Sequence, residues 1–182
     1  MEKPKNREED SMSNLKDPHW LAAYTKSRNE KKVYDRIIDE GYEAYLPLQR
    51  RLKQWSDRKK WVEEPLLRSY VFVRITQKDY YKVLSINGLI RFVSFEGKPV
   101  PIPAKQIDVL KMLLGQQLEI ETVEVNIEPG DVVDIQIGSM TGFSGELVRH
   151  QGKSKVVIQI DHVSHKLLVT LPANYVVKSL KG

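Results

Sequence analysis

The residues best suited to a chemical interaction lie in one short stretch, residues 50–61. It holds six Lys or Arg residues, one acidic residue and two of the three tryptophans. Lys and Arg attract phosphate groups and tryptophan rings stack on unpaired bases, so this composition favours binding to single-stranded nucleic acid. The alternative interpretation is a solvated β-hairpin whose tryptophans pack back on a sheet, and the pattern alone does not separate the two.

A second candidate site is an aromatic strand with the sequence RSYVFV. Side chains alternate between the two faces of a strand, so Tyr70 and Phe72 share one face and Val71 and Val73 share the other. If the valines face a layer of helices, the rings face outward, and we expect Phe92 on a neighbouring strand to join them. An exposed aromatic patch on a sheet marks a binding surface. The alternative is that all three rings belong to the core.

Residues suited to catalysis or metal binding are sparse. The chain has no cysteine, which excludes disulfides, thiolate zinc sites and cysteine nucleophiles. His162 and His165 are close in sequence, but only Asp161 accompanies them as a further ligand. The segment 152–154 resembles the end of a phosphate-binding loop, but Leu147 stands where that loop requires glycine. We therefore expect no enzymatic activity, no cofactor and no metal.

The composition is that of a soluble globular protein. The chain has 182 residues, of which 41% are hydrophobic and 29% are charged. No apolar run reaches the length of about 18 residues that a membrane span needs, and the polar N-terminus lacks the apolar segment of a secretory signal. We expect a cytoplasmic protein that does not bind a membrane.

Charge is distributed unevenly along the chain. Residues 19–115 hold 19 Lys or Arg against 11 Asp or Glu, a surplus of 8. Residues 116–126 hold three acidic residues and no basic one, and residues 127–182 hold 6 basic residues against 5 acidic ones. A basic N-terminal body suggests a polyanionic partner such as nucleic acid, although ordinary solvated charge is the alternative.

The change in composition along the chain predicts two folded domains. We expect a disordered tail over residues 1–17, a first domain over 18–115, a linker over 116–126 and a second domain over 127–182. The first domain has the order strand, helix, strand, strand, helix, strand, helix, which predicts an α+β sandwich with a mostly antiparallel sheet. The second has five short strands separated by turns, which predicts a small β-barrel.

The first helix has sequence signals at both ends. Ser27 with Glu30 three residues later predicts a capping box at its start. Gly41 stands where a helix end favours a left-handed residue.

These patterns occur in the order of a known family. Trp20 to Leu114 resembles the N-terminal (NGN) domain of NusG-type elongation factors, in which the aromatic strand lies beside a strand like residues 88–93. Residues 127–182, beginning with the sequence PGDVV, resemble a KOW domain, an SH3-like barrel. Within this superfamily, residues 55–61, 68–73 and 80–84 resemble the specialised paralogue RfaH and especially the UpxY group, whose members resemble antiterminators of polysaccharide biosynthesis operons.

The resemblance implies partners and roles. The N-terminal domain is expected to bind the clamp helices of the largest subunit of RNA polymerase and to suppress pausing and premature termination. The implied polymerase-binding residues are Leu67, Tyr70, Phe72 and Phe92. The implied contacts to non-template or upstream DNA are Lys26, Arg28, Arg51, Lys53, Arg58, Lys59 and Lys60. The KOW domain is expected to bind a further partner, such as a ribosomal protein or Rho, and the protein is expected to be a monomer.

One departure from the family pattern bears on the choice between functions. Arg68 and Ser69 stand where housekeeping NusG usually has Pro-Gly, which favours a specialised antiterminator over a housekeeping NusG-like elongation factor. A ribosomal or RNA-binding protein that merely contains a KOW barrel is a third hypothesis, but it does not account for the aromatic strand.

Overall fold

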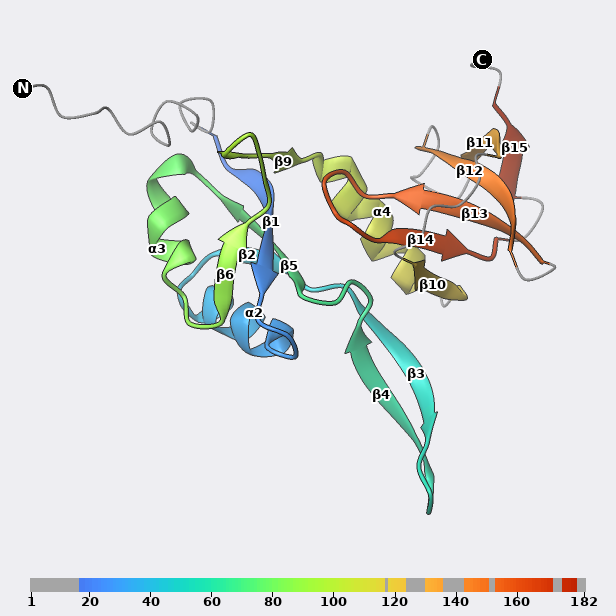
Figure 1. Ribbon diagram of the computed structural model, residues 1–182, viewed down its shortest axis with the longest axis horizontal. Helices are drawn as coiled ribbons and strands as arrows, with labels where there is room; N and C mark the ends of the chain where they lie inside the picture. The colour runs from blue at the N-terminus through green and yellow to red at the C-terminus, as the bar shows by residue number, and fades with distance from the viewer. Residues whose placement is uncertain are drawn as a thin grey trace, which may run out of the picture. The chain divides into compact units, whose positions relative to one another are not determined.

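The computed structural model describes residues 17–116, 118–123, 130–135, 143–150, 153–171 and 175–179. The chain forms two compact units, Met1–Ile107 and Asp108–Gly182, and each is described by itself (Figure 1). The expected tail lies outside the described residues except for Asp17.

The helices and strands follow in chain order. They are β1 (His19–Thr25), α2 (Glu30–Asp39), β2 (Glu43–Tyr45), β3 (Leu48–Gln54), β4 (Lys59–Pro65), β5 (Tyr70–Ile75), the 3-10 helix η1 (Gln77–Asp79), α3 (Tyr80–Leu84), β6 (Leu89–Phe92), β7 (Ser94–Phe95), β8 (Lys98–Pro99), β9 (Pro101–Ile102), α4 (Ala104–Gly115), β10 (Ile120–Val123), β11 (Asp131–Ile135), β12 (Phe143–His150), β13 (Lys153–Gln159), β14 (Lys166–Val169) and β15 (Val176–Lys178). The division between the two units falls inside α4.

The N-terminal unit is built on an antiparallel sheet in the order β2-β5-β1-β6, with β9 also paired to β1. Helices α2 and α3 pack on one face of this sheet, where Val33, Ile37 and Val83 meet the apolar side chains of β1 and β5. This arrangement confirms the expected α+β fold with a mostly antiparallel sheet.

Pro47 interrupts the strand region of residues 43–52, as the sequence predicts, and separates β2 from β3. Proline has no backbone N–H to donate to a sheet, so a strand cannot continue through it unchanged. Residues before it form β2 in the main sheet, whereas residues after it form β3, which pairs only with β4 in a separate hairpin (Figure 1). The carbonyl of Pro47 accepts a hydrogen bond from the N–H of Leu66 at 2.8 Å, which closes the base of the hairpin.

Helix α2 begins without the predicted capping box. Asn29 occupies the N-cap position and makes no side-chain cap bond. The carboxylate of Glu30 accepts instead a hydrogen bond from the backbone N–H of Ser69, 39 residues away, at 2.8 Å. The Glu30 carboxylate, which a capping box would use to accept a hydrogen bond at the start of its own helix, is therefore bonded to Ser69. At the other end the prediction is confirmed, because Gly41 has a φ of 83°.

The C-terminal unit contains an antiparallel sheet of six strands in the order β10-β14-β13-β12-β11-β15. Two glycines are required by close packing within it. A Cβ on Gly130 would lie 1.7 Å from the carbonyl oxygen of Leu147, and a Cβ on Gly145 would lie 2.5 Å from Cγ1 of Val156. Gly130 and Gly145 thus permit close packing within this sheet. Residues 136–142, between β11 and β12, lie outside the described residues.

The segment expected to be a linker contributes a strand to this sheet. Residues 120–123 form β10, which pairs with β14. Glu121 on this strand also bonds the ammonium of Lys155 on β13 at 2.6 Å, and the Lys155 side chain is only 2% exposed. Removing a charge from water is costly unless it is paired, so Glu121 is the partner that permits a buried lysine here.

Among the described residues, no helix is both long enough and apolar enough to cross a membrane. The described residues also contain no cluster of three or more His, Cys, Asp or Glu side chains that could hold a metal ion. His165 is buried, and its Nδ1 lies 3.3 Å from Oγ of Ser164.

Replacing Glu121 by glutamine should destabilise the C-terminal unit by about 3 kcal/mol, because it leaves the Lys155 ammonium buried without its counter-charge. Hydrogen exchange of the amides in β13 and β14 would measure the loss. The double variant Glu121→Gln/Lys155→Met should recover most of the protection, since it removes both charges. Unchanged protection in the single variant would show that the ion pair does not stabilise the sheet.

Candidate functional site

The pairing of β1 with its two neighbours assigns Phe92 to the helix-covered face of the sheet. Ala23 of β1 lies opposite Val71 of β5 and opposite Phe92 of β6. Directly opposed residues of antiparallel strands project from the same face. Phe92 accordingly belongs to the core beneath the helices, with its ring centroid 4.8 Å from that of Tyr80. The prediction that Phe92 joins the two rings of β5 is wrong.

The opposite face of the sheet carries an aromatic cluster with an arginine. Tyr24 of β1 lies opposite Tyr70 of β5 and Arg91 of β6, and Ala22 lies opposite Phe72. The Tyr24 and Tyr70 rings meet edge to face at 5.4 Å, and the Arg91 guanidinium lies 5.3 Å from the centroid of the Tyr24 ring. We call Tyr24, Tyr70, Phe72 and Arg91 the aromatic face. Arg91 occupies the position expected for Phe92.

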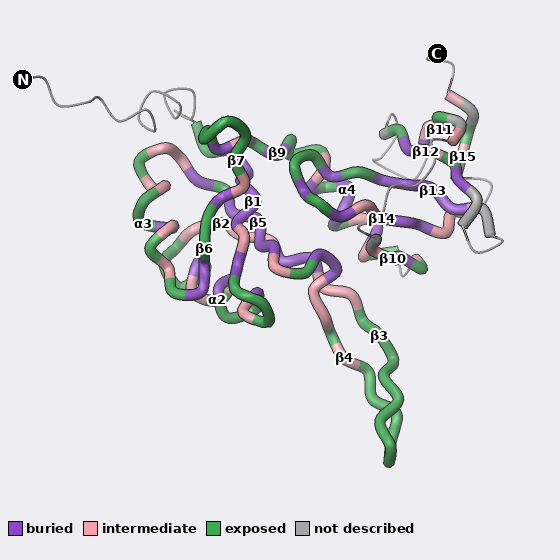
Figure 2. Tube along the Cα trace, in the orientation of Figure 1, coloured by how far each residue is buried: buried purple, intermediate pink, exposed green. Residues whose placement is uncertain are grey.

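Most rings of the aromatic face are not exposed. Tyr70 is 5% exposed and Phe72 is 0% exposed, and Leu67 in the preceding turn is also fully buried (Figure 2). The expectation that these side chains project into solvent is therefore wrong for the described conformation. Tyr24 is half-buried, and Arg91 is exposed.

An irregularity in β6 adds a second exposed residue beside Arg91. Thr25 pairs with Leu89 while Tyr24 pairs with Arg91, so Ile90 is an extra residue in the ladder. A β-bulge of this kind redirects side chains at the edge of a sheet. Ile90 and Arg91 are both exposed next to Tyr24. The bulge could not be predicted from residue types, because a bulge depends on the register between strands.

The turn before β5 explains how Ser69 replaces a glycine. Ser69 has a φ of 63°, and the N–H of Tyr70 donates to the carbonyl of Leu67 at 3.4 Å. A turn with a left-handed third residue favours glycine, since other residues are strained there. The hydrogen bond from the Ser69 N–H to buried Glu30 fixes this conformation. The turn thus keeps its geometry and leaves Arg68 exposed.

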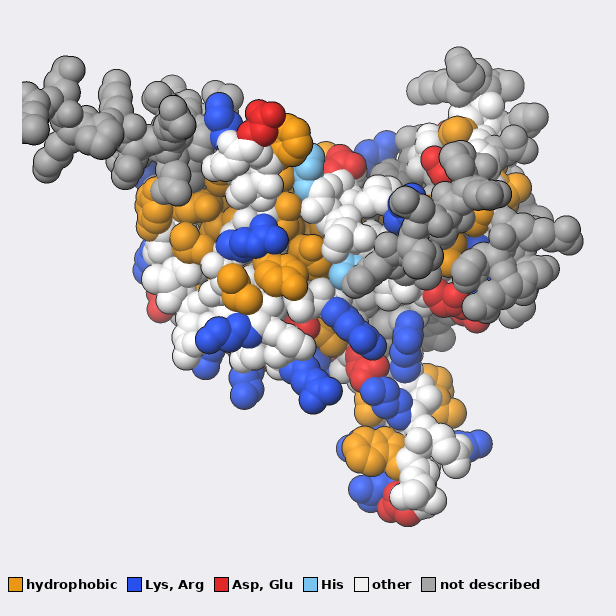
Figure 3. Space-filling view, in the orientation of Figure 1, with side chains coloured by type: hydrophobic (Ala, Val, Ile, Leu, Met, Phe, Trp, Pro, Cys, Tyr) orange, Lys and Arg blue, Asp and Glu red, His pale blue; other side chains and the backbone are white. Residues whose placement is uncertain are grey.

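The hairpin of β3 and β4 extends away from the sheet of the N-terminal unit and holds the basic and aromatic stretch (Figure 3). Every residue from 50 to 61 is exposed. Trp55 and Trp61 are 55% and 58% exposed, so neither ring packs back on the sheet. The solvated hairpin with tryptophans folded inward is therefore excluded as an interpretation.

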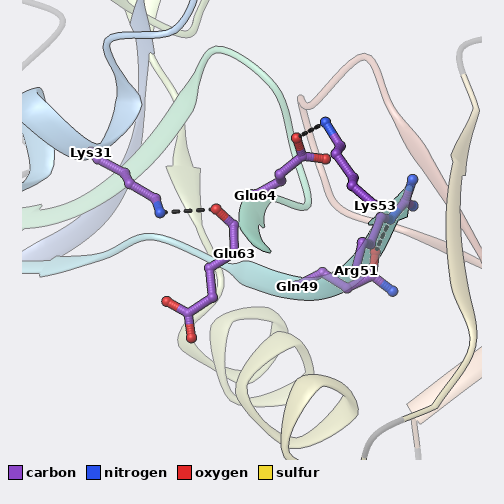
Figure 4. Close-up of polar contacts among 6 residues, drawn as sticks. All are labelled: Lys31, Gln49, Arg51, Lys53, Glu63 and Glu64. Carbon is purple, nitrogen blue, oxygen red and sulfur yellow. Dashed lines mark hydrogen bonds and ion pairs between the residues drawn. The ribbon is translucent and has the colours of Figure 1, made fainter. Parts of the chain in front are cut away.

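The base of the hairpin is tied to helix α2. Nζ of Lys31 donates a hydrogen bond to the backbone carbonyl of Glu63 at 2.9 Å (Figure 4). Beyond this point, Lys53 pairs with Glu64 across the two strands. The hydrogen bond from Lys53 lowers the pKa of the Glu64 carboxyl below its ordinary value.

Five of the seven basic residues expected to contact DNA lie together on this hairpin. They are Arg51, Lys53, Arg58, Lys59 and Lys60. Lys26 and Arg28 lie elsewhere, in the exposed loop between β1 and α2, where Arg28 has a φ of 61°. Arg50, which the expected set omitted, lies 5.6 Å from the centroid of the Trp61 ring. Arg50 stands two residues before Leu52, which lies opposite Trp61. The contact between Arg50 and Trp61 can therefore be recognised only when the register of the hairpin is known.

Truncating Phe92 to alanine should lower the free energy of unfolding of the N-terminal unit by about 3–5 kcal/mol, because the ring is core. The matched control is Phe95→Ala, which removes an exposed ring of the same size and should change stability by less than about 0.5 kcal/mol. Chemical denaturation of both variants would measure the difference. Equal stabilities would contradict the assignment of Phe92 to the core.

Comparisons with known proteins agree with this architecture. A family model described as "Transcription termination factor nusG" matches residues 18–111. NusG of Streptococcus pyogenes is 25% identical over 159 residues, covering 79% of this chain and 88% of that protein. NusG of Deinococcus radiodurans is 24% identical over 170 residues, covering 78% and 90%.

Among solved structures, one described as "Domain interaction in Thermotoga maritima NusG" is 25% identical and covers 89% of this chain and 97% of that one, with a TM-score of 0.57. The fold, the order of elements and the family model agree over more than half of the chain. This chain belongs to the NusG family of transcription termination and antitermination factors, which are not enzymes.

Proposed function

We propose that this protein is an antitermination factor that binds RNA polymerase and promotes transcription of a polysaccharide biosynthesis operon. The observation that supports a role in transcription is the family match over residues 18–111. The finer assignment to one operon rests on the resemblance of residues 55–61, 68–73 and 80–84 to the UpxY group.

The proposed polymerase contact is the aromatic face together with Ile90. Tyrosine and arginine dominate the binding energy of many protein interfaces, and here a tyrosine ring and a guanidinium are already stacked. Arg91 and Ile90 are the accessible members, and Tyr24 lies between Arg91 and the buried Tyr70 across the three strands. Phe72 lies on the same face and, like Leu67 in the preceding turn, is fully buried. The partner we propose is the clamp-helix region of the largest polymerase subunit.

The proposed nucleic-acid contact is the hairpin of β3 and β4. Its cations project into solvent on a support that is tied to the body of the N-terminal unit at Glu63. Such an array attracts phosphates of the non-template strand or the upstream duplex. Lys26 and Arg28 provide a second basic position in the β1–α2 loop.

The turn at Arg68 supports a specialised factor over a housekeeping one. Glu30 holds Ser69 in a conformation that favours glycine, so a positive charge is displayed at Arg68 without loss of the turn.

For the C-terminal unit we propose a second protein partner, such as a ribosomal protein or Rho. A housekeeping elongation factor is the alternative that the operon test below addresses.

Replacing Arg91 by glutamate should weaken binding to core RNA polymerase by about tenfold or more, because it removes the cation stacked on Tyr24 and reverses its charge. Lys32→Glu is the matched control, since it makes the same charge change at an exposed position on α2. Biolayer interferometry with immobilised polymerase would compare the two. Equal losses for both variants would show that only net charge matters and would reject the proposed contact.

An operon-specific factor should occupy one transcription unit in the cell. Chromatin immunoprecipitation of the tagged protein should give a signal confined to a single polysaccharide operon, rising within its leader. Occupancy that follows RNA polymerase across all genes would assign the housekeeping function instead. Co-purification with ribosomal subunits and without polymerase would support the ribosomal alternative.

A further inference from the structure

The two faces of the β3–β4 hairpin differ in chemistry. On one face, Leu52 lies directly opposite Trp61, and both side chains are exposed. The guanidinium of Arg50 lies over the Trp61 ring at 5.6 Å from its centroid. A cation over an aromatic face is attracted by it, so Arg50 stabilises this position of an otherwise exposed ring. We call this side of the hairpin, with Lys59 at its outer end, the platform face.

The other face of the hairpin concentrates positive charge. Lys53 lies directly opposite Lys60. Arg51, two residues before Lys53 on β3, lies on the same face. Like charges placed opposite each other destabilise a hairpin. Glu64 pairs with Lys53, but among the described residues no acidic side chain forms an ion pair with Lys60 or Lys59. An anion bound beside Lys60 would supply the counter-charge that Lys53 already receives from Glu64.

We propose that the hairpin is a selective site for single-stranded nucleic acid, in which an unpaired base stacks on Trp61 while phosphates bind the cations on both sides of the ring. The proposal rests on the nucleic-acid role proposed above for the hairpin and adds its selectivity. Lys59 and Trp61 are two residues apart on β4, a rise of about 7 Å, so a phosphate and a base of adjacent nucleotides can reach them together.

Selectivity follows from what each face offers. Cations attract the phosphates of single and double strands alike. A ring that stacks on a base adds affinity only where the base is unpaired and its face is open. Trp61 therefore favours a single strand, whereas Lys53 and Lys60 favour any nucleic acid.

Trp55 provides a matched control on the same hairpin. Trp55 is almost as exposed as Trp61, but it lies in the loop of the hairpin, where its backbone N–H donates to the backbone carbonyl of Arg58 at 2.8 Å. Trp55 lies beyond the end of β3, where strand alternation no longer assigns it to a face. Asp57 in the same loop pairs with Arg58 at 3.8 Å, and its carboxylate repels phosphate, so the loop is the less favourable position for a nucleotide. We therefore assign the stacking position to Trp61 alone.

Fluorescence anisotropy of the full-length chain, without polymerase, would test the proposal. The probes are labelled 15-nucleotide oligo-dT, oligo-rU and a 15-base-pair DNA duplex. Trp61→Ala should weaken oligo-dT and oligo-rU binding by about tenfold, while duplex binding changes less than about twofold. Trp61→Phe should retain most of the affinity, and Trp55→Ala should leave the preference for single strands unchanged. Comparison of oligo-dT with oligo-rU shows which of the two backbones the site prefers.

A second readout separates stacking from loss of structure. Addition of oligo-dT should quench tryptophan fluorescence in Trp55→Phe, which retains Trp61, and should not quench it in Trp61→Phe. Circular dichroism confirms that the variants are folded. Equal losses for single and double strands in Trp61→Ala, or unchanged oligo-dT binding, would overturn the proposal. A loss of polymerase binding with unchanged oligonucleotide binding would overturn it in favour of a protein contact. Absence of any nucleic-acid binding by the unaltered chain would instead reject the underlying role of the hairpin.

Discussion

The register of strand β1 is the constraint on which the N-terminal unit depends. This strand lies in the middle of the sheet, so its pairing with β5 and β6 decides which side chains share each face. Ala23 aligns Val71 and Phe92 under the helices, and Tyr24 aligns Tyr70 and Arg91 on the opposite side. A shift of one residue would exchange the two sets and bury a guanidinium in the core. The fold and the proposed polymerase contact therefore rest on the same alignment.

Two long-range contacts of α2 position the parts that are proposed to bind other molecules. Glu30 holds the turn before β5 through the N–H of Ser69, and Lys31 holds the base of the hairpin through the carbonyl of Glu63. Adjacent residues at the start of one helix thus anchor the beginning of the aromatic strand and the end of β4. Both contacts use backbone groups of their targets, which makes them independent of the side chains that those segments display.

Much of this structure is predictable from sequence because it depends on local patterns. The alternation in β5, the turn chemistry at Gly41, the basic hairpin and the short strands of the C-terminal unit are local signals. The errors arise where distant residues compete. Glu30 bonds Ser69 and not its own helix, and Phe92 faces the core because of its register with β1. Glu121 lies on a strand that pairs with β14, and there it pairs with Lys155 of β13. Register and long-range partners cannot be read from spacing along the chain.

We propose that this NusG-family protein lets RNA polymerase pass a terminator. Single-round transcription with purified polymerase, on a template that carries the operon leader and a terminator, tests this function. Adding the protein should raise the fraction of read-through transcripts on that leader and have little effect on an unrelated leader. Unchanged or increased termination on the operon leader would contradict it.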